Sequence, residues 1–507
     1  MKTYPKKDID LPFITTVFVM LLAAMIRLPL LSIPLERDEG GFAYIGRHLF
    51  SERLYTDLHD NKLPGLYGLY ALFVRLFGYT PEGIHTGLLI CNALAIWLMY
   101  KLFSNLFNSW TGAISATLFA LMSASPNVYG FAAHANQLLI PFALGGLIFV
   151  HNGLINNRLQ HFGLAGLLLG LAFIIKQQAV LYGVFSGVWM LWNRMQSTPD
   201  IRRITYEVAV FSAGAILPFA SVCGYFMAVG RFSDLWLWTV ELPAQLGNAP
   251  NLGDRFSLFC FYFFRVTDHF ELLWMVAAIG WGMIPFMKYT REARSFGILF
   301  PVFCALSVLI GVAFYPHYFV LCLPAVAMLA AIFIDRMRHI FTGKTGSVLS
   351  LAVLLTLVLF PVLCNFGYYF MPDFQQIHQA CYGVNRFPEM QEIGKELHEK
   401  TLDGDQIAIL GSEPEILVVA DREAASGHLF MYNLCSEGPK SSMLQQQFLN
   451  DLRQSQARFL VRVIADDSWG SNYQNTEFFK NVMAFVDSTY SIEKDLNGII
   501  IYKKKHL

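Results

Sequence analysis

The sequence predicts an α-helical polytopic membrane protein, with about eleven transmembrane helices and a small C-terminal α/β domain. Of its 507 residues, 55% are hydrophobic and only 15% are charged, whereas soluble domains carry about 25% charged residues. Apolar runs long enough to cross a bilayer follow one another as far as residue 370, and charged residues return beyond it. This pattern excludes an ordinary cytosolic enzyme, a disordered chain and a small disulfide scaffold. The formal net charge of zero argues against a nucleic-acid partner.

A bilayer core of about 30 Å needs roughly 20 apolar residues per helix. The first apolar run predicts a retained anchor and not a cleaved signal, because Arg27, Pro29 and Pro34 follow it without a small-residue cleavage site. Lys176 interrupts the long run from 161 to 193, which we divide into two short spans. The predicted spans are 11–33, 82–103, 110–126, 137–153, 161–178, 179–193, 207–229, 267–287, 296–314, 318–334 and 347–370.

Lysine and arginine residues in the connections predict the orientation, because positive loops stay on the cytoplasmic side. With a cytoplasmic N-terminus, the inner side collects pairs and clusters such as Arg202–Arg203 and Lys288–Arg294. A single helix across 161–193 would turn these clusters outward, which is the reason for dividing that run. An odd number of spans places the tail outside. We therefore expect a multi-pass protein of the inner (plasma) membrane with an extracytoplasmic, periplasmic C-terminal domain.

The predicted division is a transmembrane domain over 1–370, whose first outer loop is 34–80, and an extracytoplasmic α/β domain over 371–507. Short β-branched runs bounded by Gly, Asp or Asn predict strands, and two longer periodic segments predict helices. The strands are Ile407–Leu410, Ile416–Val419, Phe459–Val463 and Ile499–Tyr502, and the helices are Pro388–Lys400 and Ser442–Ser455. Cys381 and Cys435 fall in this domain, and spacing alone leaves open whether they pair.

The first outer loop concentrates the polar residues in which chemistry is expected. Adjacent acids Asp38 and Glu39 stand where the first span exits, and neighbouring carboxylates repel, so one of them tends to have a raised pKa or to share a cation. Such a pair suits a general base or a metal ligand, although acids at the start of a helix are a more frequent explanation. Gly41–Glu52 has helical spacing and predicts an amphipathic helix along the membrane surface.

Several stretches of the chain resemble a known family. Glu36–Tyr44 (ERDEGGFAY) and, about fifteen residues later, Asp60–Tyr67 (DNKLPGLY) are similar to the first outer loop of GT-C membrane glycosyltransferases, in the protein O-mannosyltransferase and aminoarabinose transferase branch. Gly166–Gln177, Tyr315–Phe319 and Leu410–Arg422 add to the resemblance. Leu63 and Gln137 depart from it, the first where many relatives carry Pro and the second where an acid is common.

The resemblance implies a sugar donor linked to a polyprenyl phosphate, and a reaction on the outer membrane face. We expect Asp38 to act as the general base of an inverting transfer, with Glu39 orienting it, binding the acceptor or ligating a cation. Lys62 and Lys176 are the predicted ligands of the carrier phosphate. Asp60, Tyr44 and His317 complete the predicted substrate site, although a snorkelling Lys62 and a simply packed His317 are the structural alternatives.

The resemblance also implies that relatives can hold a divalent metal near this loop. Asn61 stands before Lys62 where a ligating acid would be useful, so the sequence requires no metal or other cofactor and leaves the question open. The expected partners are the lipid-linked sugar donor, an acceptor lipid, glycan or protein, and membrane lipids.

Two other functions remain open from the sequence. A transporter or flippase of a lipid or solute would place ionisable residues at mid-membrane in paired halves, whereas here they gather at the outer edge. A non-catalytic component of cell-envelope assembly would make Asp38 dispensable. The sugar, the acceptor and the carrier length are not determined by the sequence.

Overall fold

The computed structural model describes residues 10–197, 200–246, 252–311, 313–341, 344–383, 385–435, 440–470 and 473–505. The chain divides into two compact units, Met1–Leu31 with Leu88–Ser221 and Pro250–Asp373, and Ser32–Gly87 with Val222–Ala249 and Phe374–Leu507. The first outer loop therefore belongs to the same unit as the tail. The predicted division at residue 370 instead grouped the loop with the transmembrane helices. That boundary itself stays a prediction.

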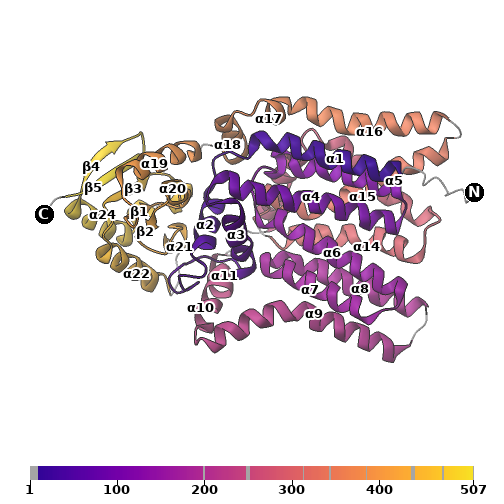
Figure 1. Cartoon of the computed structure of the whole chain (residues 1–507), viewed down its shortest axis with the longest axis horizontal. Coiled ribbons are helices and arrows are strands. Elements are labelled where there is room, and N and C mark those ends of the chain that lie inside the picture. The colour runs from indigo at the N-terminus through magenta and orange to yellow at the C-terminus, as the bar shows by residue number, and fades with distance from the viewer. Residues whose placement is uncertain are drawn as a thin grey trace, which may run out of the picture. The chain divides into compact units, whose positions relative to one another are not determined.

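The first unit is helical, and helices occupy all the predicted spans (Figure 1). Its helices are α1 (Leu11–Arg27), α4 (Pro81–Leu106, beginning in the second unit), α5 (Ser109–Ala124), α6 (Ala135–Asn156), α7 (Leu159–Ile175), α8 (Val180–Ser197), α9 (Ile201–Ala228, ending in the second unit), α12 (Leu252–Thr267), α13 (Glu271–Met283), α14 (Arg291–Leu309), α15 (Leu323–Ile340), α16 (Lys344–Cys364) and α17 (Phe366–Phe370). Short 3₁₀ turns η1 (Leu28–Leu30), η2 (Pro126–Val128), η3 (Gln177–Ala179), η5 (Ile284–Phe286) and η6 (Pro316–Cys322) join or extend them.

The prediction of a multi-pass membrane protein is confirmed. Among the described residues, 7 helices are long and apolar enough to cross a membrane, or up to 8 if the bent pair Gly253–Thr267 and Glu271–Phe286 is one span. The helices at the remaining predicted spans are shorter or less apolar, so the count of about eleven stays a prediction. Helix α12, bent by 105° from its neighbour, was not predicted from the sequence.

The division of the run from 161 to 193 into two helices is confirmed. Helix α7 ends at Ile175, Lys176 is extended with φ −152° and ψ 128°, and α8 starts after the turn η3. The two helices contact each other, as Figure 1 also shows. Lys176 therefore belongs to neither helix. It lies at the break between two apolar helices.

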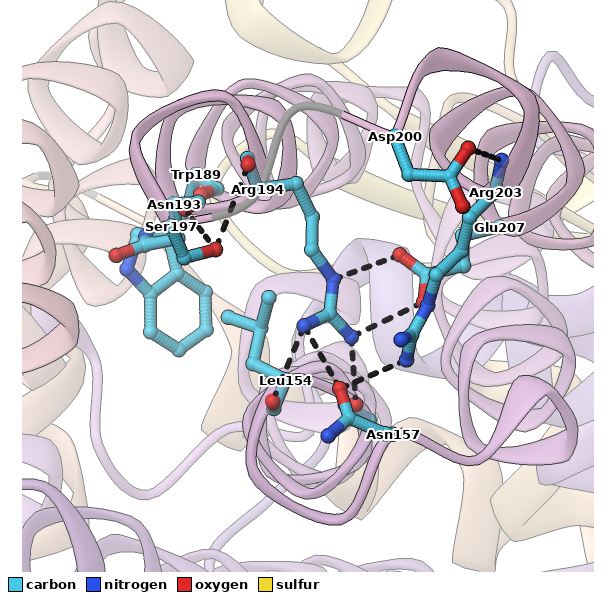
Figure 2. Close-up of polar contacts among 10 residues, drawn as sticks. Leu154, Asn157, Trp189, Asn193, Arg194, Ser197, Asp200, Arg203 and Glu207 are labelled. Atoms are coloured by element: carbon cyan, nitrogen blue, oxygen red, sulfur yellow. Dashed lines mark hydrogen bonds and ion pairs between the residues drawn. The ribbon is translucent and has the colours of Figure 1, made fainter.

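A buried ion pair holds together the ends of α6, α8 and α9 (Figure 2). The guanidinium of Arg194, in the last turn of α8, donates to both carboxylate oxygens of Glu207 on α9, at 2.7 and 3.0 Å. It also donates to the carbonyl oxygens of Gly153 and Leu154 at the end of α6, at 3.0 and 3.3 Å. The last carbonyls of a helix have no intrahelical donor, so Arg194 caps α6 while it pairs with α9.

The second unit combines the first loop, residues 222–249 and the tail. The loop forms α2 (Arg37–His48) and α3 (Pro64–Phe77), which pack on each other. Residues 222–249 contribute α10 (Phe232–Trp236), the π-turn η4 (Leu237–Glu241) and α11 (Leu242–Leu246). The tail helices are α18 (Phe374–Tyr382), α19 (Phe387–Lys400), α20 (Glu415–Ala420), α21 (Tyr432–Cys435), α22 (Ser441–Gln454), α23 (Asp466–Trp469) and α24 (Glu477–Thr489), with a 3₁₀ turn η7 (Tyr473–Asn475).

The tail contains a 5-stranded mixed sheet in the order β2-β1-β3-β5-β4. Its strands are β1 (Gln406–Leu410), β2 (Glu423–Ala424), β3 (Phe459–Val463), β4 (Tyr490–Asp495) and β5 (Ile499–Lys504). Strand β1 pairs in parallel with β2 and β3, while β5 pairs antiparallel with β3 and β4. The predicted small α/β domain is thus confirmed in its class. Cys381 and Cys435 are not joined by a disulfide bond.

One predicted strand is wrong. Ile416–Val419 is not a strand but lies within α20, and Ile416, Leu417 and Val418 are buried. Four consecutive apolar residues are compatible with a strand or with a helix buried on all sides, and periodicity cannot separate the two. The tail also contains α24 and β4, which were not predicted.

The amphipathic helix predicted over Gly41–Glu52 begins earlier and is not a one-sided surface helix. Helix α2 starts at Arg37, and both its apolar residues and its glycines are buried in protein. A Cβ atom on Gly40 would lie 2.4 Å from the backbone nitrogen of Glu415 in α20, so glycine permits this close packing. Phe50, which lies in the predicted segment but follows the end of α2, is 90% exposed.

Candidate active site

The first turn of α2 is organised by three acidic residues. Glu36 is the N-cap residue, and its carboxylate accepts hydrogen bonds from the backbone nitrogens of Asp38 (3.0 Å) and Glu39 (2.9 Å). The carboxylate of Glu39 accepts in return from the backbone nitrogen of Glu36 at 3.4 Å. This is a capping box, which satisfies backbone donors that a helix start leaves unpaired. The helix-start explanation therefore applies to Glu36 and Glu39.

The three carboxylates have different surroundings. Glu39 is fully buried, and its second oxygen lies 3.1 Å from Nε2 of the buried His85. Burial, together with the charges of Asp38 and Glu39, raises the pKa of Glu36 well above its usual range. Asp38 is only half-buried, and its carboxylate makes no hydrogen bond to the described residues of this unit. Asp38 is thus the acid of the first turn that is not used in capping.

The tail holds this turn in place. Arg37 donates to the Glu413 carboxylate at 3.0 Å in an ion pair that is mostly buried. Because Gly40 packs directly on Glu415, both acids of the Ser412–Glu415 segment lie against α2. This segment therefore connects β1 to α20 and also positions the helix that carries Asp38.

Tyr44 and Asp60, both predicted to bind substrate, are engaged within the protein. The Tyr44 hydroxyl accepts from the backbone nitrogen of Ala424 at 2.9 Å and donates to Glu423 at 3.3 Å. The buried Asp60 carboxylate accepts from the Tyr67 hydroxyl (2.8 Å) and the Asn61 backbone nitrogen (2.6 Å). Burial raises the pKa of Asp60.

Lys62 follows this network at the edge of the loop. The Tyr55 hydroxyl donates to its carbonyl oxygen at 2.5 Å, and the Lys62 Nζ donates to the side-chain oxygen of Asn61. Its ammonium also lies 5.8 Å from the centre of the Phe42 ring. The oxygens of Asp60 and Asn61 thus accept hydrogen bonds within the loop.

Lys176 and His317 belong to a polar cluster in the helical unit. The Lys176 Nζ donates to the side-chain oxygen of Asn136 at 2.7 Å and lies 4.3 Å from the centre of the Tyr318 ring. The His317 ring stacks on that of His134 with centroids 4.0 Å apart. The side-chain amide of Asn136 donates to Gln178 at 3.2 Å, which fixes the Asn136 oxygen toward the lysine.

Aromatic contacts extend this cluster to a second cation. Tyr129 lies 6.0 Å from both histidine rings of the pair, and the Arg265 guanidinium lies 5.9 Å from the Tyr129 ring. The cluster therefore contains two cations, Lys176 and Arg265, together with the stacked histidines. An ammonium and a guanidinium among aromatic and amide groups suit the binding of a phosphate.

The structure brings the predicted residues together in two sets. Asp38, Glu39, Tyr44, Asp60 and Lys62 share the second unit, and Lys176 and His317 share the first. The partners that fix them were not predicted from the sequence, and these are Glu36, His85, Asn136 and Arg265. No local pattern marks His85 or Arg265, since each lies in a helix far along the chain from its partner. Glu36 stands three residues before Glu39, and this spacing resembles a capping signal.

Comparison with protein families gives one match. Residues 62–222 match the family described as dolichyl-phosphate-mannose-protein mannosyltransferase. Comparison with curated proteins by sequence finds no match.

Three solved structures are similar over 97% of this chain. ArnT from Cupriavidus metallidurans bound to undecaprenyl phosphate has a TM-score of 0.63 at 13% identity, and its apo state has 0.60 at 14%, with 97% of each covered. The archaeal oligosaccharyltransferase AglB from Archaeoglobus fulgidus, in complex with an inhibitory peptide and a dolichol-phosphate, has 0.53 at 11% identity, with 74% of its chain covered. At such identities the likeness shows a common fold. The family match and the fold together confirm the resemblance to GT-C membrane glycosyltransferases that use lipid-linked donors.

Proposed function

We propose that this protein transfers a sugar from a polyprenyl-phosphate carrier to a hydroxyl group of an acceptor, on the extracytoplasmic face of the membrane. The family matched by residues 62–222 and the fold shared with ArnT support this function. The relatives were solved with undecaprenyl phosphate and with dolichol-phosphate. A long-chain lipid phosphate is therefore the proposed donor class here as well, with a lipid, a glycan or a protein as acceptor.

Asp38 is the proposed general base. The observation that supports this role is that the other two acids in the first turn of α2 are held by hydrogen bonds. Glu36 and Glu39 are occupied by the capping box and by His85, whereas the half-buried Asp38 has an unoccupied carboxylate within its unit. Glu39 has no access to solvent, so its proposed role is to hold the turn that orients Asp38.

The proposed reaction is a single displacement with inversion. The acceptor oxygen forms a bond to the anomeric carbon while the bond from that carbon to the phosphate oxygen breaks. The electron pair leaves with the carrier phosphate, and the acceptor proton passes to Asp38. Because a phosphate is a good leaving group, one carboxylate suffices and no second carboxylate nucleophile is required.

Lys62 and Lys176 are the proposed partners of the carrier phosphate. The ammonium group of Lys62 donates one hydrogen bond within its unit, to Asn61, which leaves further N–H groups for an anion. Lys176 stands at the break between α7 and α8, with Asn136 and Tyr318 fixing its position. His317 is proposed to support this cluster through its stack with His134.

A transporter or flippase is the alternative function. The buried charged residues of the helical unit, among those that the structure describes, are Arg27, Arg194, Glu207 and Asp335. Each is held by fixed partners: Arg27 by two backbone carbonyls, Arg194 and Glu207 by each other, and Asp335 by Asn108. Such residues stabilise helix packing, whereas a transport pathway needs ionisable groups that exchange partners. This favours the enzyme.

The test compares Asp38→Asn with the wild type and with Asp495→Asn, a control at an exposed site in β4. Each purified protein is supplied with a labelled polyprenyl-phosphate sugar and cell-envelope extract, and transfer of the label is measured. Loss of the base should lower the rate about 10²- to 10⁴-fold while the melting temperature stays unchanged.

The Glu39→Gln variant distinguishes the proposed base, Asp38, from the residue proposed to hold its helical turn in place. Because Glu39 is buried between the Glu36 backbone and His85, this variant should lower the melting temperature as well as the rate. Equal transfer by Asp38→Asn and the wild type would contradict the base assignment. A wild type that transports the labelled lipid but transfers no sugar would support the alternative.

A further inference from the structure

The end of α2 opposite Asp38 carries a separate group of potential metal ligands. His48 is the last residue of the helix, Glu52 lies one turn beyond it, and Glu423 begins strand β2 of the tail. The His48 Nδ1 lies 3.5 Å from a Glu52 oxygen, and its Nε2 lies 3.5 Å from a Glu423 oxygen. One ligand atom from each of the three residues lies within 4.8 Å of the other two.

Charge around this group is unbalanced. Three arginines in the neighbourhood already pair with three aspartates: Arg47 with Asp421, Arg422 with Asp403, and Arg53 with Asp57. No described lysine or arginine forms an ion pair with Glu52 or Glu423, and His48 contacts both carboxylates. Two neighbouring carboxylates without a permanent cation attract a positive ion.

The geometry fits a small divalent ion. Tetrahedral zinc with bonds of about 2.0–2.1 Å has ligand atoms roughly 3.3–3.4 Å apart. The two 3.5 Å contacts use opposite nitrogens of His48, whereas a set with one atom from each residue lies within 4.8 Å, a spacing that rotation of the two partly exposed glutamates shortens. His48 is mostly buried, whereas the glutamate side chains are 32% and 42% exposed. This exposure lets an ion enter and leaves a coordination position for water.

A hydrogen bond from Tyr44 holds Glu423, one of the three ligands, in place. The Tyr44 hydroxyl donates to Glu423 at 3.3 Å and accepts from the backbone nitrogen of Ala424 at 2.9 Å. The Tyr44 ring also lies 4.5 Å from that of His48. Partners of this kind orient metal ligands and are part of a working site.

We propose that a divalent transition-metal ion of the zinc type binds to one nitrogen of His48 and to the carboxylates of Glu52 and Glu423, with water completing its shell. The imidazole ligand favours such an ion over calcium or magnesium, which take oxygen ligands. The ion joins the end of the first-loop helix to strand β2, and thereby stabilises the second unit. It takes no part in sugar transfer, so this site is independent of the proposed function.

The test uses the full-length protein in detergent after removal of metals with a chelator. Zn²⁺ at micromolar concentration should raise the melting temperature of the wild type, and Co²⁺ should give the visible absorption of a four-coordinate site at one ion per chain. Glu52→Gln and Glu423→Gln should each weaken binding at least about tenfold and remove most of the thermal shift. Glu399→Gln, at an exposed site in α19, is the matched control and should keep both responses.

Two further results separate this site from the catalytic proposal. Asp38→Asn should lose sugar transfer and keep the full response to Zn²⁺ and Co²⁺. The absence of a metal response in the wild type would overturn the proposal, and the contacts of His48 with the two carboxylates would then have a structural role only. An undiminished response of both Glu52→Gln and Glu423→Gln would overturn it equally.

Discussion

Three carboxylates within four residues differ in their burial and in their hydrogen bonds, and this difference is the basis of the roles proposed for them. Glu36 caps the helix and Glu39 contacts His85, both in buried positions, whereas Asp38 keeps partial exposure and an open carboxylate. A carboxylate that accepts a proton from a substrate must be reachable and must not be held by other donors. The acid pair is visible in the local sequence. The packing around it is the reason for proposing Asp38, and not Glu39, as the base.

Two stacked histidines make the second unit sensitive to acid. The rings of His59 in the first loop and His428 in the tail lie 4.0 Å apart, and Trp238 also stacks on His59, at 5.0 Å. Burial lowers the pKa of His59 from 6.5 to about 4, and burial together with the charge of His59 lowers that of His428. Both rings are therefore neutral in the folded protein near pH 7.

We expect the melting temperature to fall as the pH is lowered from about 6.5 toward 4. In this range the unfolded chain binds protons that the folded protein excludes, so stability is complete above about pH 6.5 and decreases below it. A shift of this size at His59 alone corresponds to roughly 3 kcal/mol. Melting curves between about pH 7 and 5 measure the slope, which should be shallower for His59→Gln. An equal slope for that variant would contradict this account.

Among the secondary-structure elements, helices α6, α8 and α9 depend on one buried arginine (Figure 2). Arg194 forms an ion pair with Glu207 and donates hydrogen bonds to two carbonyl oxygens of α6. No other described side chain makes both kinds of contact. Removing one partner of a buried pair costs about 3–5 kcal/mol when the other charge is left uncompensated. Here Glu207 keeps the more exposed Arg203 at 3.0 Å, so we expect a loss below that range.

Arg194→Met should therefore lower the melting temperature far more than Arg202→Met. Arg202 is an exposed arginine on α9 and is the matched control, because surface substitutions usually stay within about 0.5 kcal/mol. Thermal unfolding in detergent measures both. The Arg194→Met/Glu207→Leu double variant should recover part of the loss, because it removes a buried carboxylate that would keep only the more exposed Arg203 as its ionic partner. Equal melting temperatures for the two single variants would show that the pair does not hold these helices together.

At the scale of the whole molecule, orientation in the membrane is the prediction with the widest consequences. The excess of lysine and arginine in alternate connections places Asn156, at the end of α6, in the cytoplasm and Ser488, in α24, outside. Single cysteines at these two exposed positions, in a cysteine-free background, can be labelled with an impermeant maleimide in intact cells. Ser488→Cys should react at once and Asn156→Cys only after permeabilisation. The reverse pattern would contradict the extracytoplasmic site.

The sequence by itself determined the membrane helices, the break at Lys176 and most of the tail sheet, because hydropathy and β-branched runs are local properties of the chain. It failed where one apolar run suits either a strand or a buried helix, as at Ile416–Val419, and where α2 packs on α20 through Gly40. The acid pair and Lys62 were also visible locally, and so was the resemblance that the fold confirms.

Only the tertiary structure shows which partners hold each of these residues. His85 reaches Glu39 from another helix, Asn136 reaches Lys176 across the helical unit, and Glu423 reaches His48 from the tail. Partners separated by tens or hundreds of residues leave no periodic trace, because side-chain contacts depend on how elements pack and not on their order. The sequence therefore led to the candidate residues, and their packing is the basis of the roles proposed for them.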